Sequence, residues 1–227
     1  MGCDRPGRGD LYGGRMQVAA RTEVGHVRAR NEDALLVAME QRFVAVCDGL
    51  GGHPDGDVAS ATAVESLRAS APTAATADGL VAALRAAHLA VVAAAGEDPD
   101  RRGMATTVVA ALLGDEVVTV AHVGDSRAYL RAPDGSLAQV TRDHGMGGYI
   151  TQALGLDRDI EPDVVEVPAP PGARLLLCSD GLSNMVDAEA IAALLGRGDA
   201  EEACDALVTE ALDRGGIDNV TVVVAVF

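Results

Sequence analysis

The stretch Arg42-Phe43-Val44-Ala45-Val46-Cys47-Asp48-Gly49-Leu50-Gly51-Gly52-His53 decides the fold. Its apolar run, residues 43–47, has the length and composition of a strand that is buried on both faces. The run ends at Asp48, and a carboxylate beside a buried strand is costly unless a cation or a hydrogen-bond donor meets it. The glycines that follow let backbone pass close to whatever Asp48 holds. A glycine-rich turn in which Asp48 is only a turn residue explains this one stretch equally well.

The same pattern recurs along the chain. Three more apolar runs border an acid: residues 117–123 with Asp125, 174–178 with Asp180, and 220–227 with Asp218. Because Asp is unfavourable inside strands, its repeated placement at their ends predicts several acids at one rim of a sheet. Like charges raise one another's pKa, and bound divalent cations remove that cost. Oxygen ligands suit Mg²⁺, Mn²⁺ or Ca²⁺ rather than zinc.

Composition narrows the classes of protein. The chain has 227 residues, a net charge of −16 and only 2% aromatic residues, so its core is built from Val, Leu, Ala and Ile. The negative charge argues against a nucleic-acid partner. No Cys-x-x-Cys spacing occurs, which favours a reducing, cytoplasmic setting over a disulfide scaffold. We expect no signal peptide and no membrane-spanning run. The four cysteines are Cys3, Cys47, Cys178 and Cys204.

The order of the predicted elements indicates an α+β sandwich. Residues 1–15 read as a disordered tail, and 16–227 as one domain. Helices are predicted at 57–70, 79–95, 188–195 and 200–212, with a helical turn at 150–154. Strands are predicted at 16–21, 34–39, 43–47, 106–113, 117–123, 127–131, 137–140, 164–167, 175–178 and 220–226. Two helix pairs and about ten strands predict helices on both outer faces of two antiparallel sheets.

Six short motifs occur in one order along the chain. They are Gly25-x-Val27-Arg28-x-x-Asn31-Glu32-Asp33, Asp48-Gly49-x-Gly51-Gly52-His53, Gly103-Met104-x-Thr106-Thr107, Val123-Gly124-Asp125-Ser126-Arg127, Ser179-Asp180-Gly181-Leu182 and Asp218-Asn219-Val220-Thr221. Together they resemble the metal-dependent protein phosphatases of type 2C in their compact bacterial form. The resemblance covers essentially the whole chain after the tail. It implies a four-layer α-β-β-α sandwich, in agreement with the order of elements.

The resemblance also implies a binuclear metal site. By position, Asp48 looks like the acid that bridges two Mn²⁺ or Mg²⁺ ions. Asp180 and Asp218 would hold the first ion, and the Gly49 carbonyl would help to hold the second. Glu32 or Asp33 would serve the second ion directly or through water.

Three further roles follow from the same resemblance. Asp125 looks like a ligand of a third, looser ion. Arg28 looks like the clamp for the substrate phosphate, and Asn219 would steady the metal site from its edge. Two metal ions lower the pKa of a shared water and neutralise phosphate, while a guanidinium holds two phosphate oxygens at once, which a Lys cannot do. Without its motif, Arg28 would read as a surface arginine.

The sequence departs from the family pattern in three places. Leu50 stands where many members carry a His that protonates the leaving group. His53, His144 or a metal-bound water then become the alternative acids, although both histidines also read as structural residues. Asn184 stands where many members have an Asp at the third ion. The flap between Thr141-x-Asp143-His144 and residues 149–155 is reduced to Gly145-Met146-Gly147-Gly148, which predicts an open approach to the site. His88 reads as a structural core residue.

Three functions remain open at this level. The first is hydrolysis of phosphoserine and phosphothreonine in proteins that bacterial-type Ser/Thr kinases have phosphorylated, by a monomeric enzyme. The second is a catalytically weak relative that binds metal or phosphoprotein as a regulatory module, a hypothesis kept alive by Leu50 and the short flap. The third is an acidic calcium-binding protein, which the absence of an EF-hand spacing disfavours.

Overall fold

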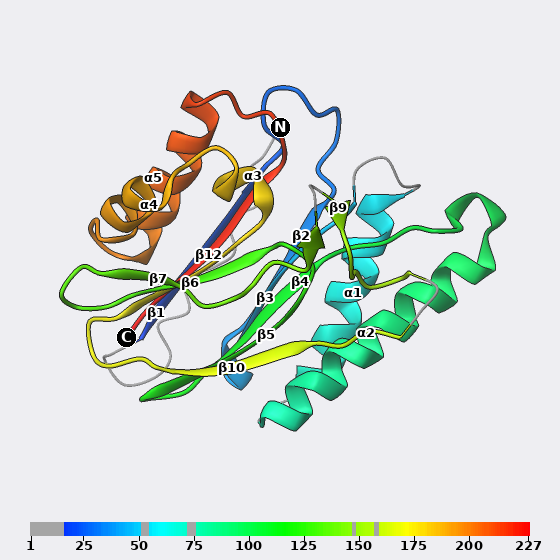
Figure 1. The fold of residues 1–227 in the computed structure, drawn as a ribbon, viewed down its shortest axis with the longest axis horizontal. Helices are drawn as coiled ribbons and strands as arrows, with labels where there is room; N and C mark the ends of the chain where they lie inside the picture. Colours follow the sequence, from blue (N-terminus) through cyan, green and yellow to red (C-terminus); the bar gives the residue numbers. More distant parts are fainter. Residues whose placement is uncertain (1–15, 51–54, 72–75, 147–148, 157–158) are drawn as a thin grey trace.

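Two five-stranded antiparallel sheets pack against each other in the computed structural model, which describes residues 16–50, 55–71, 76–146, 149–156 and 159–227 (Figure 1). The first sheet has the order β1-β12-β11-β6-β7, and the second has the order β10-β5-β4-β3-β2. The first contains β1 (Gln17–Glu23), β12 (Val220–Val226), β11 (Arg174–Cys178), β6 (Arg127–Arg131) and β7 (Leu137–Gln139). The second contains β10 (Asp163–Pro168), β5 (Val117–Val123), β4 (Val108–Leu113), β3 (Phe43–Asp48) and β2 (Asp33–Ala38).

Alternation along β3 shows why its apolar run is continuous. Val44 and Val46 face the other sheet and join the inner core, which also contains Val223 of β12. Phe43 and Ala45 face outward and join the core under the helices. Because successive side chains of a strand point to opposite faces, both faces of β3 are buried and both need apolar residues.

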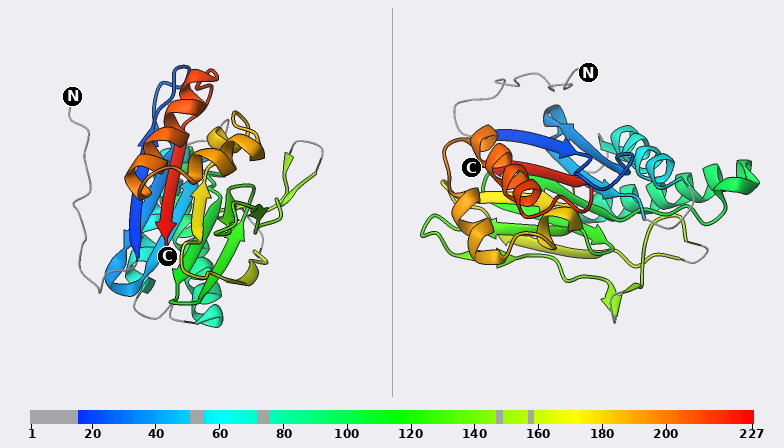
Figure 2. Two further views of the ribbon diagram at one scale, coloured as in Figure 1. Left: turned by 90° about the vertical axis from the view of Figure 1, so that its left-hand side faces the viewer. Right: turned by 90° about the horizontal axis from the view of Figure 1, so that it is seen from above.

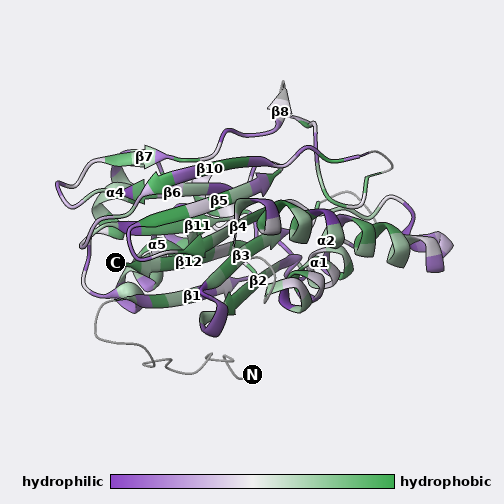
Figure 3. Cartoon of the chain, turned by 90° about the horizontal axis from the view of Figure 1, so that it is seen from below, coloured by the Kyte–Doolittle hydropathy of each residue, from purple (hydrophilic) through white to green (hydrophobic). Residues whose placement is uncertain are grey.

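Helices cover the outer face of each sheet. The helices α1 (Gly56–Ser70) and α2 (Ala77–Glu97) pack on the second sheet, and α4 (Ala188–Leu195) and α5 (Ala200–Asp213) pack on the first. Figure 2 shows the two helix groups on opposite sides of the sheets. The predicted four-layer α-β-β-α sandwich is therefore confirmed. In Figure 3 the strands and inner helix faces carry most of the hydrophobic colour.

Local capping fixes where several helices begin. Thr76 accepts a hydrogen bond from the Gly79 N–H at 3.0 Å and caps α2, which begins two residues before the predicted start at residue 79. Asp199 and Glu202 form a reciprocal capping box at the start of α5. Two short 3₁₀ helices, η1 (Met39–Gln41) and η3 (Pro99–Arg101), serve as connectors.

Helix α2 is long and apolar enough to cross a membrane, by length and composition alone. Its 21 residues reach a mean hydropathy of 1.7 in the most apolar window. From the sequence, no segment of the chain was expected to meet this test. The helix instead packs as a core element, with Leu80, Leu84 and Val91 fully buried. The helix of a sandwich layer passes the same test as a membrane span, so this helix gives weak evidence for a membrane.

The predicted helical turn at 150–154 is wrong. Two short strands, β8 (Gly145–Met146) and β9 (Tyr149–Ile150), pair antiparallel in this region. Beyond it, the Leu154 N–H donates to the Thr106 carbonyl at 2.8 Å, and the Thr106 N–H donates back at 3.0 Å. These bonds take the backbone groups that a helix would have used, and the segment is extended. A short helix, α3 (Asp180–Ser183), was not predicted.

Several predicted structural residues lie as expected. Cys47, Cys178 and Cys204 are buried and free. His88 is a core residue whose Nδ1 accepts a hydrogen bond from the Gly155 N–H at 3.2 Å. Cys3, the tail 1–15, His53 and the glycines 147–148 lie outside the described residues.

Candidate metal centre

Strand ends from both sheets bring the predicted acids together. Asp48 is the last residue of β3 and pairs in register with Asp33, the first residue of β2. Asp180 follows β11 after Ser179 and begins α3, and Asp218 lies two residues before β12. Since β11 and β12 are neighbours in the first sheet and β2 and β3 are neighbours in the second, the two pairs of acids meet where the sheets lie together.

The pKa shifts of these carboxyl groups show how closely they interact. The pKa of Asp48 is raised well above its usual value, first by burial and then by the charges of Asp33, Asp180, Asp125 and Asp218. Burial, followed by neighbouring acids, raises the pKa of Asp180 to about 6. Burial also raises the pKa of Asp33 to about 6, although hydrogen bonds to it act in the opposite direction. Each of these groups resists carrying a negative charge beside the others.

A divalent cation fits this cluster chemically. Oδ2 of Asp33 accepts a hydrogen bond from Ser179 Oγ at 2.8 Å. Its Oδ1 is buried and has no hydrogen-bond partner among the described residues. A buried, unpartnered carboxylate oxygen within a group of acids is costly, and a hard cation with oxygen ligands removes that cost. The donor set therefore fits Mn²⁺ or Mg²⁺.

Glu32 and Gly49 lie close to Gly56, the first residue of α1. The Gly49 N–H donates to the Glu32 carbonyl at 3.0 Å. A Cβ at Gly49 would lie 2.3 Å from the Gly56 carbonyl oxygen, so no other residue fits there without movement of the backbone. The Glu32 carboxylate lies beside Gly56: a Cβ added to Gly56 would be 3.0 Å from Glu32 Oε2. This close approach holds the Asp48-Gly49 backbone against the loop that carries Glu32 and Asp33.

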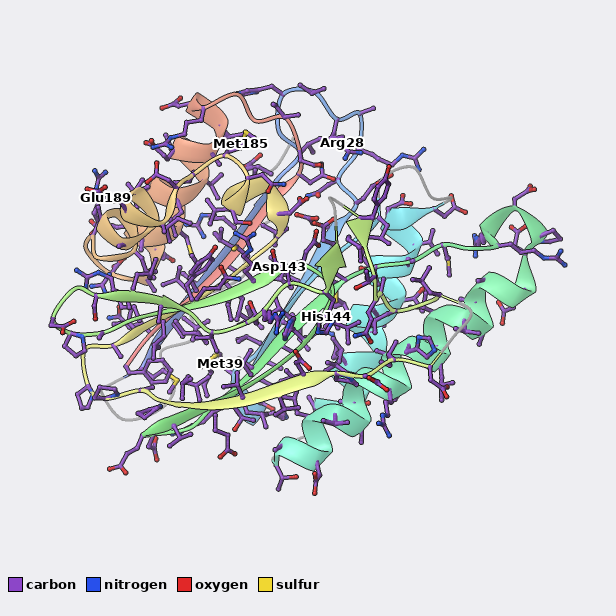
Figure 4. All side chains as sticks on the ribbon, viewed as in Figure 1. Arg28, Met39, Asp143, His144, Met185 and Glu189 are labelled. Atoms are coloured by element: carbon purple, nitrogen blue, oxygen red, sulfur yellow. The ribbon has the colours of Figure 1, made fainter. Side chains whose placement is uncertain are left out.

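Arg28 lies at the edge of the acid cluster, on the loop between β1 and β2 (Figure 4). Its Nη2 donates to Asp218 Oδ2 at 2.7 Å. This hydrogen bond raises the pKa of the Arg28 guanidinium further, so the side chain keeps its positive charge. One such bond uses one of five guanidinium N–H donors. The arrangement places the guanidinium beside the carboxylates, while the role of Arg28 as a phosphate clamp stays a prediction.

Asn219 and Thr107 hold the backbone around the acids. Asn219 Oδ1 accepts from the Glu32 N–H at 2.8 Å, while its Nδ2 donates to the carbonyls of Val24 and Arg30. The predicted place of Asn219 at the edge of the site therefore has a geometric basis. Thr107 Oγ1 accepts from the Asp48 N–H at 3.1 Å.

Three hydroxyl residues belong to the sequence motifs, but no role was predicted for them: Thr107, Ser126 and Ser179. Thr107 Oγ1 and Ser126 Oγ lie 2.6 Å apart in a buried hydrogen bond. Ser179 Oγ accepts from the Thr221 N–H at 3.0 Å in addition to its bond with Asp33. Each residue adjoins or faces a metal-ligand candidate, and a hydroxyl next to an acid at a strand end is the signal that could have identified them.

Comparison with known proteins places the chain in a family. The family model described as Protein phosphatase 2C matches residues 24–212. The chain belongs to this family. It is 37% identical, over 92% of its length, to the serine/threonine protein phosphatase PstP of Mycobacterium tuberculosis, and it spans only 45% of that relative. It is 36% identical to the serine/threonine phosphatase stp of Listeria innocua, over 91% of this chain and 94% of that one.

A solved type 2C structure has the same fold. The catalytic domain of PstP in complex with two manganese ions superposes with a TM-score of 0.84 at 37% identity, covering 93% of this chain and 97% of that one. The predicted fold and family are thereby confirmed, and the relatives named above are serine/threonine protein phosphatases. The expected pair of Mn²⁺ ions matches the two ions of that relative.

The structure also shows the contacts of the residues that depart from the type 2C pattern. The Leu50 N–H donates to the Ala105 carbonyl at 2.9 Å, which anchors the backbone behind the acid cluster. Asn184 Nδ2 donates to Asp180 Oδ2 at 3.1 Å. Burial raises the pKa of Asp125, the candidate for a third ion. The segment expected as a shortened flap includes β8, which pairs with β9. The alignment with PstP extends over 233 residues and covers 92% of this chain.

His144 stacks on the ring of His122 and faces Asp163. The three side chains offer ligand atoms within 4.8 Å of one another, which resembles a metal site. However, His144 Nδ1 accepts from the Gly124 N–H at 3.3 Å, so its Nε2 carries the proton and faces Asp163 Oδ2 at 3.2 Å. A protonated Nε2 has no lone pair for a metal. The hydrogen bonds therefore assign His144 a structural role.

Proposed function

We propose that residues 16–227 form a catalytic domain that hydrolyses phosphoserine and phosphothreonine in proteins with the help of two Mn²⁺ or Mg²⁺ ions. The single observation that carries this proposal is the group of buried acids at the strand ends, with an unpartnered Asp33 oxygen inside it and Arg28 at its edge. The relatives that are serine/threonine phosphatases support it.

In this proposal the acids divide the work of holding metal. Asp48 would contribute to both ions, Asp180 and Asp218 to the first, and the Gly49 carbonyl to the second. Glu32 or Asp33 would serve the second ion directly or through water, and Asp125 would hold a looser third ion. When bound, the pair of ions supplies an activated water and offsets the charge of the phosphate.

Side chains of the protein itself bind the phosphate and position the acids. Arg28 keeps its charge. It binds phosphate oxygens with the guanidinium N–H donors that are not bonded to Asp218. Asn219 and Thr107 keep the acids in register through backbone hydrogen bonds. Leu50 cannot donate a proton, and the ring of His144 is held by Gly124 and Asp163, so we assign proton delivery to the leaving oxygen to water.

The substrates that fit are phosphoproteins made by bacterial-type Ser/Thr kinases. We further propose a monomer that works in the cytoplasm and binds neither nucleic acid nor membrane. The acidic charge of −16 supports the absence of nucleic acid among the partners.

The test is a manganese-dependent assay on p-nitrophenyl phosphate and on a phosphothreonine peptide. The wild type should turn over both substrates, and Asp48→Asn should abolish turnover. Arg28→Ala should lose peptide turnover by at least tenfold while Mn²⁺ binding, measured by calorimetry, stays within about twofold. Tight Mn²⁺ binding by the wild type without turnover would instead support a regulatory module.

A further inference from the structure

Two exposed aliphatic side chains flank the proposed phosphate clamp. Among the described residues, six large hydrophobic side chains are exposed, and Val27 and Ile217 are two of them, at 67% and 55% exposure. Val27 directly precedes Arg28, and Ile217 directly precedes Asp218. Single exposed aliphatics are ordinary, but here two lie next to the two partners of one ion pair.

The loops that carry these side chains are held together. The His26 N–H donates to the Gly216 carbonyl at 2.7 Å, so Val27 and Ile217 each lie one residue from a shared hydrogen bond. A Cβ at Gly25 would lie 2.3 Å from the Asp218 carbonyl oxygen, which shows how closely the backbones pack. The two aliphatic groups are therefore presented by fixed backbone, and their ordering is complete before any ligand arrives.

A substrate held by Arg28 would bring its neighbouring residues to these side chains. An extended peptide advances about 3.3 Å per residue, so the residues on either side of the phosphorylated one lie within reach of positions adjacent to Arg28. An acidic neighbour would meet the carboxylates of the site, whereas an aliphatic neighbour would cover Val27 and Ile217 and remove apolar surface from water.

We infer that Val27 and Ile217 form a specificity patch for an aliphatic side chain next to the phosphorylated Ser or Thr. This inference rests on the proposed function, because it places the phosphate at Arg28. The occupant is the substrate itself, since each aliphatic residue is next in the chain to one partner of the ion pair between Arg28 and Asp218. The contact gives selectivity among phosphoproteins that the short β8–β9 strand pair does not need to supply.

The experiment compares phosphothreonine peptides that differ at one position. A Ser-based peptide is the reference, and Leu or Asp is placed in turn at each of the two positions before and after the phosphothreonine. The measured quantity is kcat/KM in saturating Mn²⁺, expressed as the ratio of Leu to Ser peptides. We expect at least one position at which Leu is preferred about tenfold.

Variants then locate the preference. In Val27→Ser/Ile217→Ser the Leu-to-Ser ratio should fall to within about twofold of one. The matched control Leu89→Ser, an equally exposed aliphatic on α2, should keep the wild-type ratio. A ratio near one at every position in the wild type would overturn the inference, as would a preference that survives the double substitution.

Other outcomes are separable from these. A wild type that does not hydrolyse p-nitrophenyl phosphate refutes the proposed function, whereas activity on it without a peptide preference refutes only the specificity patch. Sedimentation of the wild type and of the double variant is measured in parallel. A dimer that dissociates on substitution would show that a second copy occupies the patch, and that result too overturns the inference.

Discussion

Replacing Asp180 with Asn should stabilise the metal-free protein near neutral pH. Burial, and then the charges of Asp125 and Asp218, raise the pKa of Asp180 from 3.8 to about 6. Between these pH values the folded protein holds a proton that the unfolded chain has released, so the free energy of unfolding falls as pH rises from about 4 to about 6. A rise of this size corresponds to about 3 kcal/mol at pH 7.5.

The substitution removes that charge while keeping the local hydrogen bond. Asn184 Nδ2 donates to Asp180 Oδ2 at 3.1 Å, and an Asn at this position retains an oxygen that accepts it. The variant should therefore exceed the wild type by about 1–3 kcal/mol in free energy of unfolding at pH 7.5, and by nearly nothing at pH 4. In a domain of this size the melting temperature rises by about 2–4 °C per kcal/mol.

Urea unfolding followed by far-ultraviolet circular dichroism, in EDTA at pH 4, 5, 6 and 7.5, measures this difference. Asp115→Asn is the control, since that exposed acid should change stability by less than about 0.5 kcal/mol at every pH. In excess Mn²⁺ the order should reverse, because only the wild type gains the full binding free energy. Parallel pH dependences of the wild type and the Asp180 variant would refute the reasoning.

The remaining predictions concern neighbouring residues. Arg28→Lys should lower kcat/KM on a phosphothreonine peptide at least tenfold, since Lys cannot bind two oxygens in the same plane; equal rates would contradict the clamp. Gly49→Ala should lower stability by more than 2 kcal/mol and weaken Mn²⁺ binding in calorimetry, whereas Gly96→Ala, in open space, should leave both within about 1 kcal/mol. Thr107→Val should cost about 1–3 kcal/mol in chemical denaturation by leaving the Asp48 N–H unpaired, and no measurable loss would mean that the bond is dispensable.

The arrangement of acids was predictable because it follows from strand ends. A five-residue apolar run that ends at Asp48 has few alternatives to a buried strand, and the repetition of that pattern at Asp180 and Asp218 identifies one rim. The α2 start at Thr76 was predictable for the same kind of reason, since a capping residue acts locally. Local chemistry and binary patterning therefore carried both predictions.

Contacts between residues far apart in the chain could not be predicted from the sequence. Residues 150–154 have helical spacing, but the Thr106–Leu154 bonds decide their conformation from far along the chain. The roles of Thr107 and Ser179 likewise depend on which strand lies beside Asp48 or Asp33. The bond between Arg28 and Asp218 joins residues 190 positions apart, and it was not predicted from the sequence.

The pairing of β1 with β12 has a consequence for synthesis of the protein. The register joins Gln17 to Val226, and β12 separates β1 from β11 in the first sheet. On the ribosome, β1 therefore waits without a partner until nearly every later element has emerged, and Asp218 arrives with the same segment. A nascent chain that stops before this segment lacks Asp218 of the acid cluster, and its open strand edges are a target for chaperones.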